Sequence, residues 1–263
     1  MRSANPALNN NTFRNTRRVA QSEAMTIDGT VNKTALGLLL LMTSAIYSWN
    51  NPEIALMLFW PITIFTFILL MITIFNKKAA PYTVPLYCLA EGVVLGGISA
   101  MADAMYPGIA NQAIFLTFGI LIALLLLYKS KLIQVTDNFR LGVFSATFGI
   151  LIVYVLNMIL SFFGISFMGS LFGNGTTGIL FSLFVIGIAS MNLVLDFDFI
   201  EKGAESGAPK YMEWYGAFGL MITLVWLYIE ILNLLMKLRS SCLLYTSDAA
   251  DDLLCVDLGG RRI

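Results

Sequence analysis

Seven long apolar blocks follow a polar stretch of about thirty residues at the start of the chain. A helix needs ~20 apolar residues to cross the ~30 Å of bilayer hydrocarbon, and most of the blocks reach that length. Turn-forming residues, such as Asn50-Asn51-Pro52 and Gly173-Asn174-Gly175, lie in the breaks between them. The pattern predicts an all-α integral membrane protein with a seven-transmembrane helix bundle, with spans near 34–49, 54–75, 83–105, 113–128, 141–164, 178–200 and 211–238.

The two ends of the chain do not share this pattern. Residues 1–32 are polar and Arg-rich, without the apolar core and cleavage site of a signal peptide, and we predict a disordered cytoplasmic tail. Residues 33–239 form the predicted transmembrane domain. Residues 240–263 are acidic, end in Gly-Gly-Arg-Arg-Ile and resemble a translated adapter sequence. We interpret them as a non-native tail, so they take no part in the fold prediction.

Basic residues alternate between the connections and predict the orientation in the membrane. Three connections carry no Lys or Arg, and the others carry all those that lie between spans. We therefore expect the N-terminus in the cytoplasm and the C-terminus outside. Lys237 and Arg239 fit that outer end poorly and predict an irregular seventh span. The basic connections are the tail with Lys33, then Lys77 and Lys78, then Lys129, Lys131 and Arg140, then Lys202 and Lys210.

Composition removes several function classes. The chain is 58% apolar and only 12% charged, with a mean hydropathy of +0.79, whereas soluble domains are about 25% charged. It contains no histidine, which excludes imidazole metal sites, His-based triads and His pH switches. Three cysteines suggest neither a disulfide framework nor a zinc site. We expect no enzymatic activity, no catalytic residues, no cofactor and no nucleic-acid partner; the lipid bilayer is the expected surrounding.

Acidic residues inside the apolar blocks are the candidate chemistry. An acid in bilayer hydrocarbon costs several kcal/mol unless it is paired, protonated or hydrated, so such residues usually have a function. Asp196 and Asp198 lie at the end of the sixth block, two residues apart, and therefore point to nearly opposite sides of a helix. We expect the deeper Asp196 to face the bundle and Asp198 simply to contact water at the interface.

Two further acids lie in other blocks. Glu230 lies within the seventh, and Asn233 shares its helix face. This polar stripe predicts a helix face toward the bundle, although a purely structural interhelical hydrogen bond is the alternative. Glu91, in the third block, has the same estimated depth as Asp196, about 10 Å from the cytoplasmic end. Asp196 and Glu91 are therefore a second possible acidic pair.

Close carboxylates suit cation and proton chemistry. Calcium prefers oxygen ligands, and two adjacent carboxylates can share a proton and release it as the pH rises. Lys77 and Lys78 are possible counter-charges at the cytoplasmic mouth, although such lysines are more often topology signals only. Gly96 and Gly97 allow either close helix packing or bending of the third helix during gating.

Three stretches carry a family resemblance. LVLDFDFIEKG in the sixth span, LYIEILNLL in the seventh and EGVVLGG in the third resemble the Bax inhibitor-1 (transmembrane BAX inhibitor motif) family, in its bacterial branch. The likeness covers roughly residues 33–238. It implies a seven-helix bundle with the last helix central, in a bacterial plasma (inner) membrane. It also implies that a pair of acids senses pH and gates a calcium leak; carried over, the pair is Asp196 and Glu230, which would also be the calcium ligands.

The chain departs from the family pattern at several points. The second acid is Glu rather than Asp, the sixth-to-seventh connection is longer, Asp198 is a rival for the first position, and Glu91 has no counterpart. Asp196 lies ~10 Å from the cytoplasmic exit but Glu230 ~28 Å along its helix. A direct pair therefore requires both helices to project into the cytoplasm.

We predict a pH-sensitive calcium leak channel or cation/proton exchanger, with calcium as the transported ion and protons as the second ligand. The alternative, which the resemblance also implies, is a regulatory protein that binds and modulates a membrane-bound ATP-dependent protease, with the N-terminal tail as the handle. An intramembrane aspartyl protease is disfavoured because a GxGD-type motif is absent.

Overall fold

The computed structural model describes residues 24–164 and 169–253, with the backbone alone for Ser170 and residues 242–253. Within these residues, seven helices are long and apolar enough to cross a membrane, which confirms the predicted seven-span, all-α class. The spans are α2 (Ile27–Asn50), α3 (Pro52–Phe75), α4 (Ala80–Met105), α5 (Ile109–Lys129), α6 (Asp137–Phe162), α8 (Thr176–Glu205) and α9 (Met212–Leu253). Two short helices, η2 (Lys77–Ala79) and α7 (Gly169–Phe172), lie in connections.

The helices extend beyond the apolar blocks because polar residues cap and continue their ends. Thr26 accepts a hydrogen bond from the Gly29 amide at the start of α2, and Thr136 accepts one from the Phe139 amide at the start of α6; both are N-caps. Residues 27–32, predicted as part of the disordered tail, are therefore helical. Residues 1–23 of that predicted tail lie outside the described residues.

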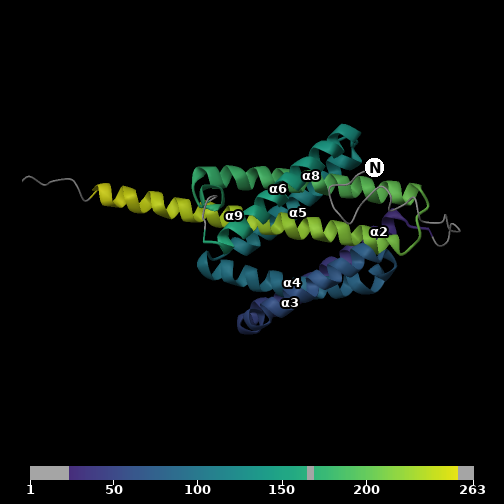
Figure 1. Ribbon diagram of the computed structural model, residues 1–263, viewed down its shortest axis with the longest axis horizontal. Helices are drawn as coiled ribbons and strands as arrows, with labels where there is room; N and C mark the ends of the chain where they lie inside the picture. The colour runs from purple at the N-terminus through teal and green to yellow at the C-terminus, as the bar shows by residue number, and fades with distance from the viewer. Residues whose placement is uncertain (1–23, 165–168, 254–263) are drawn as a thin grey trace, which may run out of the picture.

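The last helix is central. Figure 1 shows α9 running along the long axis between α8 on one side and α3 with α4 on the other. It is the most buried of the seven spans and packs against α2, α4, α5 and α8. Helices α4 and α8 make no extensive contact, because α9 lies between them.

Glycines bring α4 against α2. A Cβ atom at Gly92 would lie 2.3 Å from the Leu41 carbonyl oxygen, and one at Gly96 would lie 2.2 Å from that of Ala45. Both glycines are four residues apart, on one face of an uninterrupted helix. Their function in this structure is therefore close packing, as is common for small residues between membrane helices.

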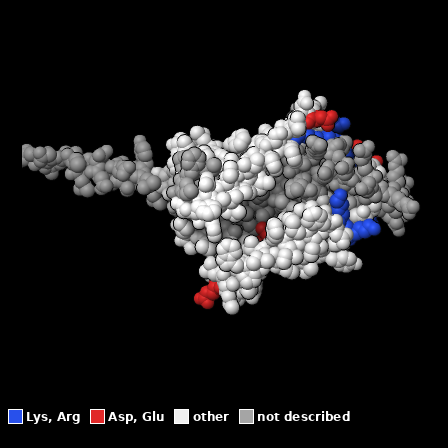
Figure 2. Space-filling model, viewed as in Figure 1, with Lys and Arg blue, Asp and Glu red and all other residues white. Residues whose placement is uncertain are grey.

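Charged side chains gather at the end of the bundle where α9 begins, as Figure 2 shows for the blue residues on the face in view. We call this the charged end and define it by Lys33, Lys77, Arg140, Lys202 and Glu213. Their contacts join the start of α2, α6 and α9 with η2 and the last turns of α8. This is the side to which the alternation of basic residues assigns the N-terminus.

The seventh span is regular, so the irregularity predicted from Lys237 and Arg239 is wrong. Helix α9 passes through both residues and continues to Leu253, with its last turns beyond the bundle (Figure 1). The Lys237 ammonium donates hydrogen bonds to the Gly178 carbonyl at 3.2 Å and to the Ser182 hydroxyl at 2.9 Å. These bonds satisfy the cation within an intact helix.

Candidate functional site

Antiparallel packing of α8 and α9 places Asp196 against a hydroxyl. Thr223 donates a hydrogen bond of 2.6 Å to Asp196 Oδ2, and Asp196 is only 1% exposed. Lys237 reaches Ser182 in the same interface. These contacts lie fourteen residues apart on both helices, so the two helices keep one register over that length.

Glu230 lies midway between these contacts, seven residues after Thr223. It is 5% exposed, and its Oε1 accepts a hydrogen bond of 2.6 Å from the Tyr154 hydroxyl of α6. Seven residues correspond to ~10 Å along a helix. Asp196 and Glu230 therefore both face the bundle interior but lie about two turns apart, too far for a direct hydrogen bond.

Asn192 occupies the space between them, one turn from Asp196 on α8. Its amide donates to Thr147 of α6 at 2.7 Å and to the Ile188 carbonyl at 2.9 Å. Four hydrogen-bonded pairs of buried or half-buried polar side chains thus follow the α6–α8–α9 interface. We call it the polar track and define it by Asp196, Thr223, Asn192, Thr147, Glu230, Tyr154, Ser182 and Lys237.

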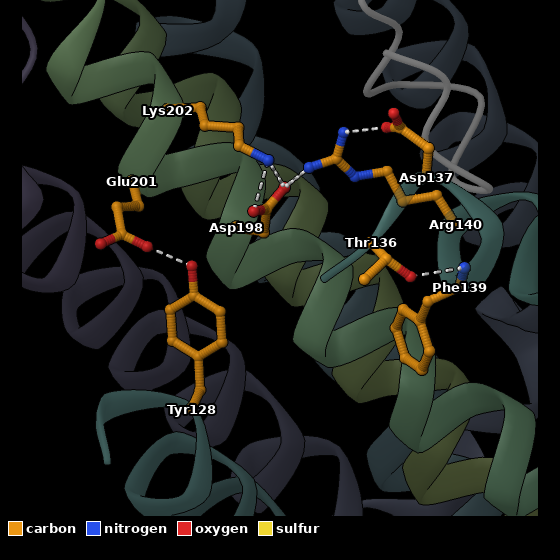
Figure 3. A network of polar contacts seen from close by, with 8 residues as sticks. All are labelled: Tyr128, Thr136, Asp137, Phe139, Arg140, Asp198, Glu201 and Lys202. Carbon is orange, nitrogen blue, oxygen red and sulfur yellow. Dashed lines mark hydrogen bonds and ion pairs between the residues drawn. The ribbon is translucent and has the colours of Figure 1, made fainter. Parts of the chain in front are cut away.

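Asp198 lies at the charged end of the track, and it does not simply contact water as the sequence suggested. It is 9% exposed and lies between two cations (Figure 3): Arg140 of α6 at 2.6 Å and Lys202, one turn further along α8, also at 2.6 Å. The two cations compensate the buried carboxylate, as burial of a charge requires. Both aspartates are therefore buried, one in an ion-pair network and one against a hydroxyl.

The remaining candidates lie elsewhere. Glu91 lies beside Thr66 of α3, and α9 separates its helix from α8, so the alternative pair of Glu91 with Asp196 is not formed. Lys77 lies over the Tyr215 ring, 5.6 Å from its centroid, and Lys78 is exposed.

Asn233 is half-buried, one turn beyond Glu230 on α9. It lies on the same helix face as Glu230, in agreement with the polar stripe read from the sequence.

The described residues of the polar track do not form a preformed metal-binding site. Among the described residues, no group of three or more acidic or Cys side chains is placed to hold a metal ion. Calcium binds oxygen at about 2.3–2.6 Å, so a single ion cannot contact both Asp196 and Glu230 across two helical turns in this conformation. Each acid has a hydroxyl beside it, and a hydroxyl donates to an ionised carboxylate or accepts from a protonated one. The arrangement therefore accommodates either protonation state.

Three residues that contact the buried acids could not be identified from the sequence, although for two of them the sequence contains a signal. Thr223 lies seven residues before Glu230 and hence on the same helix face. Tyr154 is a polar group inside an apolar run. Arg140 was interpreted only as a topology signal, because nothing in the sequence connects it to Asp198.

A second buried acid near the charged end was also missed. Glu213, 1% exposed, accepts hydrogen bonds of 3.0 Å from both the amide and the hydroxyl of Thr26 and forms an ion pair with Lys33. The Met25 amide donates to the Ala208 carbonyl at 2.6 Å. These contacts, which we call the α2–α9 clamp, fasten the start of the first span to the start of the last.

Comparison with known proteins agrees with this architecture. The family model described as Bax inhibitor 1 like matches residues 5–240, a range that contains every residue of the polar track. Neither the curated proteins nor the solved structures contain a match to the chain. Since the family match spans most of the chain, the resemblance seen in the sixth and seventh spans is confirmed: the protein is a multi-pass membrane protein of the Bax inhibitor 1-like family.

Proposed function

We propose that the protein is a pH-sensitive calcium leak channel or cation/proton exchanger, in which Asp196 and Glu230 hold the cation or proton in turn. The observation that carries the proposal is the polar track. Two buried carboxylates on adjoining helices lie in a row of four hydrogen-bonded polar pairs, which extends from Asp196 and Thr223 to Ser182 and Lys237. Polar and ionisable residues inside a membrane bundle commonly mark ion and proton pathways.

The spacing of the acids favours successive rather than joint binding. A cation that leaves one carboxylate meets the Asn192 amide oxygen and the Thr147 hydroxyl before the next, because these groups lie at the level between the two acids. Every track side chain is buried or half-buried, and we take this conformation to be a closed one. Opening requires α6 to move away from the α8–α9 pair, and Asp198, with its two cations at the charged end, holds α6 in place. We assign that end to the cytoplasm, from the alternation of basic residues.

The test is calcium uptake into proteoliposomes between about pH 6 and 8, the range in which a coupled pair of acids can titrate. Asp196→Asn and Glu230→Gln should each abolish uptake or its pH dependence, because each removes one site of charge. Glu53→Gln is the matched control, since Glu53 is an exposed acid at the opposite end of the bundle. Absence of uptake at every pH, or unchanged uptake in both track variants, would refute the proposal.

The alternative, modulation of a membrane-bound ATP-dependent protease, stays a prediction, and most of the tail that would serve as its handle lies outside the described residues.

A further inference from the structure

A cavity of about 400 Å³ lies between α2, α4, α5 and α9. Its α9 wall, with Met221, Val225 and Tyr228, is on the opposite face of that helix from Thr223 and Glu230, at 100° per residue. The cavity is therefore separate from the polar track, and α9 divides the two. We call it the lateral slot. Its volume lies within the range of small-molecule sites.

The slot is continuous with the lipid-facing surface. Helices α2 and α5 make no extensive contact with one another in the described part of the chain, and the slot opens between them. Met42 and Ile46 of α2 both line the slot and belong to the exposed apolar surface, with 39% and 59% exposure. In a membrane the opening therefore faces acyl chains rather than water.

The slot has the depth of one leaflet. Along α2 it extends from Asn50, the last residue of the helix, to Leu38. Those twelve residues rise by ~18 Å, compared with ~15 Å for half of the bilayer hydrocarbon. The end of the slot nearest Asn50 lies at the end of the bundle opposite the charged end. There Asn50 and Asn111 expose amide side chains.

The buried polar side chains of the slot, Ser99, Thr117 and Tyr228, already have partners. Ser99 and Tyr228 share a hydrogen bond of 2.6 Å, and Thr117 donates to the Ala113 carbonyl at 2.7 Å. The described residues that line the slot include no charged side chain. Water is stable in a cavity only with two to four polar partners, so these walls favour an apolar occupant.

We infer that the lateral slot binds one acyl chain of a membrane phospholipid from the leaflet opposite the charged end. The headgroup lies at this end of the slot, where the Asn111 amide can donate to its ester or phosphate oxygens. Asn50 Nδ2 already donates to the Ile46 carbonyl at 3.0 Å, and its second hydrogen can donate to the headgroup as well. Because amides rather than cations form the rim, binding does not depend on a net negative headgroup. The inference is independent of the function of the polar track.

Native mass spectrometry of the full chain, released from detergent micelles with added phosphatidylethanolamine or phosphatidylglycerol, tests the inference. We expect one phospholipid per chain to survive activation that removes all others, with either headgroup. Ala45→Phe on the α2 wall and Ile114→Trp on the α5 wall fill the slot and should each reduce that retention roughly tenfold. Using both walls keeps the test valid if one variant does not fold.

Matched controls place the same side chains on the lipid-facing surface outside the slot. Met57→Phe on α3 and Leu116→Trp on α5 are at positions 82% and 48% exposed, and both should retain the lipid. Three results would overturn the inference: no retained lipid, equal retention in the filled variants, or retention of phosphatidylglycerol alone, which would indicate a charged headgroup site elsewhere.

Discussion

Replacing Gly96 by alanine should destabilise the bundle, because the new methyl group has no room between α4 and α2. Its Cβ would lie 2.2 Å from the Ala45 carbonyl oxygen and 2.8 Å from the Ala45 Cα. Ordinary contacts begin at ~3.5 Å, so the helices must separate by about 1 Å. Both atoms are backbone, so a side-chain rotation cannot relieve the overlap.

The cost follows from two terms. Overpacking of this kind costs ~1–3 kcal/mol. Separation of the helices also lengthens the hydrogen bond that Ser48 donates from α2 to the Val93 carbonyl, now 2.8 Å, which adds ~1 kcal/mol. Alanine recovers ~0.4–1 kcal/mol through the reduced entropy of the unfolded chain. The free energy of unfolding should fall by about 1–3.5 kcal/mol.

The assay is reversible unfolding in bicelles with rising denaturing detergent, followed by helical circular dichroism. Gly119→Ala is the matched control, since Gly119 is also within a helix but a Cβ there meets nothing within 4 Å. That control should be neutral or slightly stabilising. If Gly96→Ala is as stable as Gly119→Ala, the close approach of α2 and α4 does not contribute to stability as argued.

Three further variants test other contacts. Tyr154→Phe removes the hydroxyl beside Glu230 and should lower calcium uptake roughly tenfold, since hydrogen bonds to charged groups contribute ~1.5–3 kcal/mol; unchanged uptake would remove Tyr154 from the pathway. Arg140→Met leaves Asp198 with one cation and should cost about 1–3 kcal/mol of unfolding free energy, less than the full loss of a buried pair; adding Asp198→Asn should recover part of it in a double-mutant cycle. Glu213→Gln weakens the α2–α9 clamp and should accelerate limited proteolysis at the start of α2, which mass mapping of the fragments will show or refute.

Hydropathy was sufficient to predict the seven spans, because apolar length alone decides whether a helix crosses a membrane. Hydropathy made the predicted helices too short at their ends. Polar residues after an N-cap, such as those from Ile27 to Lys33, continue the helix beyond its apolar block. The inward orientation of Asp196 and Glu230 could also be predicted, because an acid that faces bilayer hydrocarbon costs several kcal/mol.

The register between helices could not be predicted. A sequence gives the position of a residue along its own helix, but the partner of Asp196 depends on how α8 and α9 align. That alignment is set by many apolar contacts, and it selected Thr223 rather than Glu230. The α2–α9 clamp could not be predicted either, because it joins residues 187 positions apart. One of them, Thr26, belongs to the segment predicted to be a disordered tail.

The hydrogen bond between Asp196 and Thr223 has a consequence for biosynthesis. When α8 leaves the ribosome, Asp196 has no α9 beside it to supply the Thr223 hydroxyl. An aspartate without a partner in a lone helix costs up to ~2.5–3.5 kcal/mol on insertion, the value for the helix centre. Helix α8 should therefore remain at the translocon until α9 emerges, and the two should enter the lipid as a hairpin. A chain truncated at Glu205 should fail to integrate its sixth span, which a glycosylation-site reporter after that residue would detect.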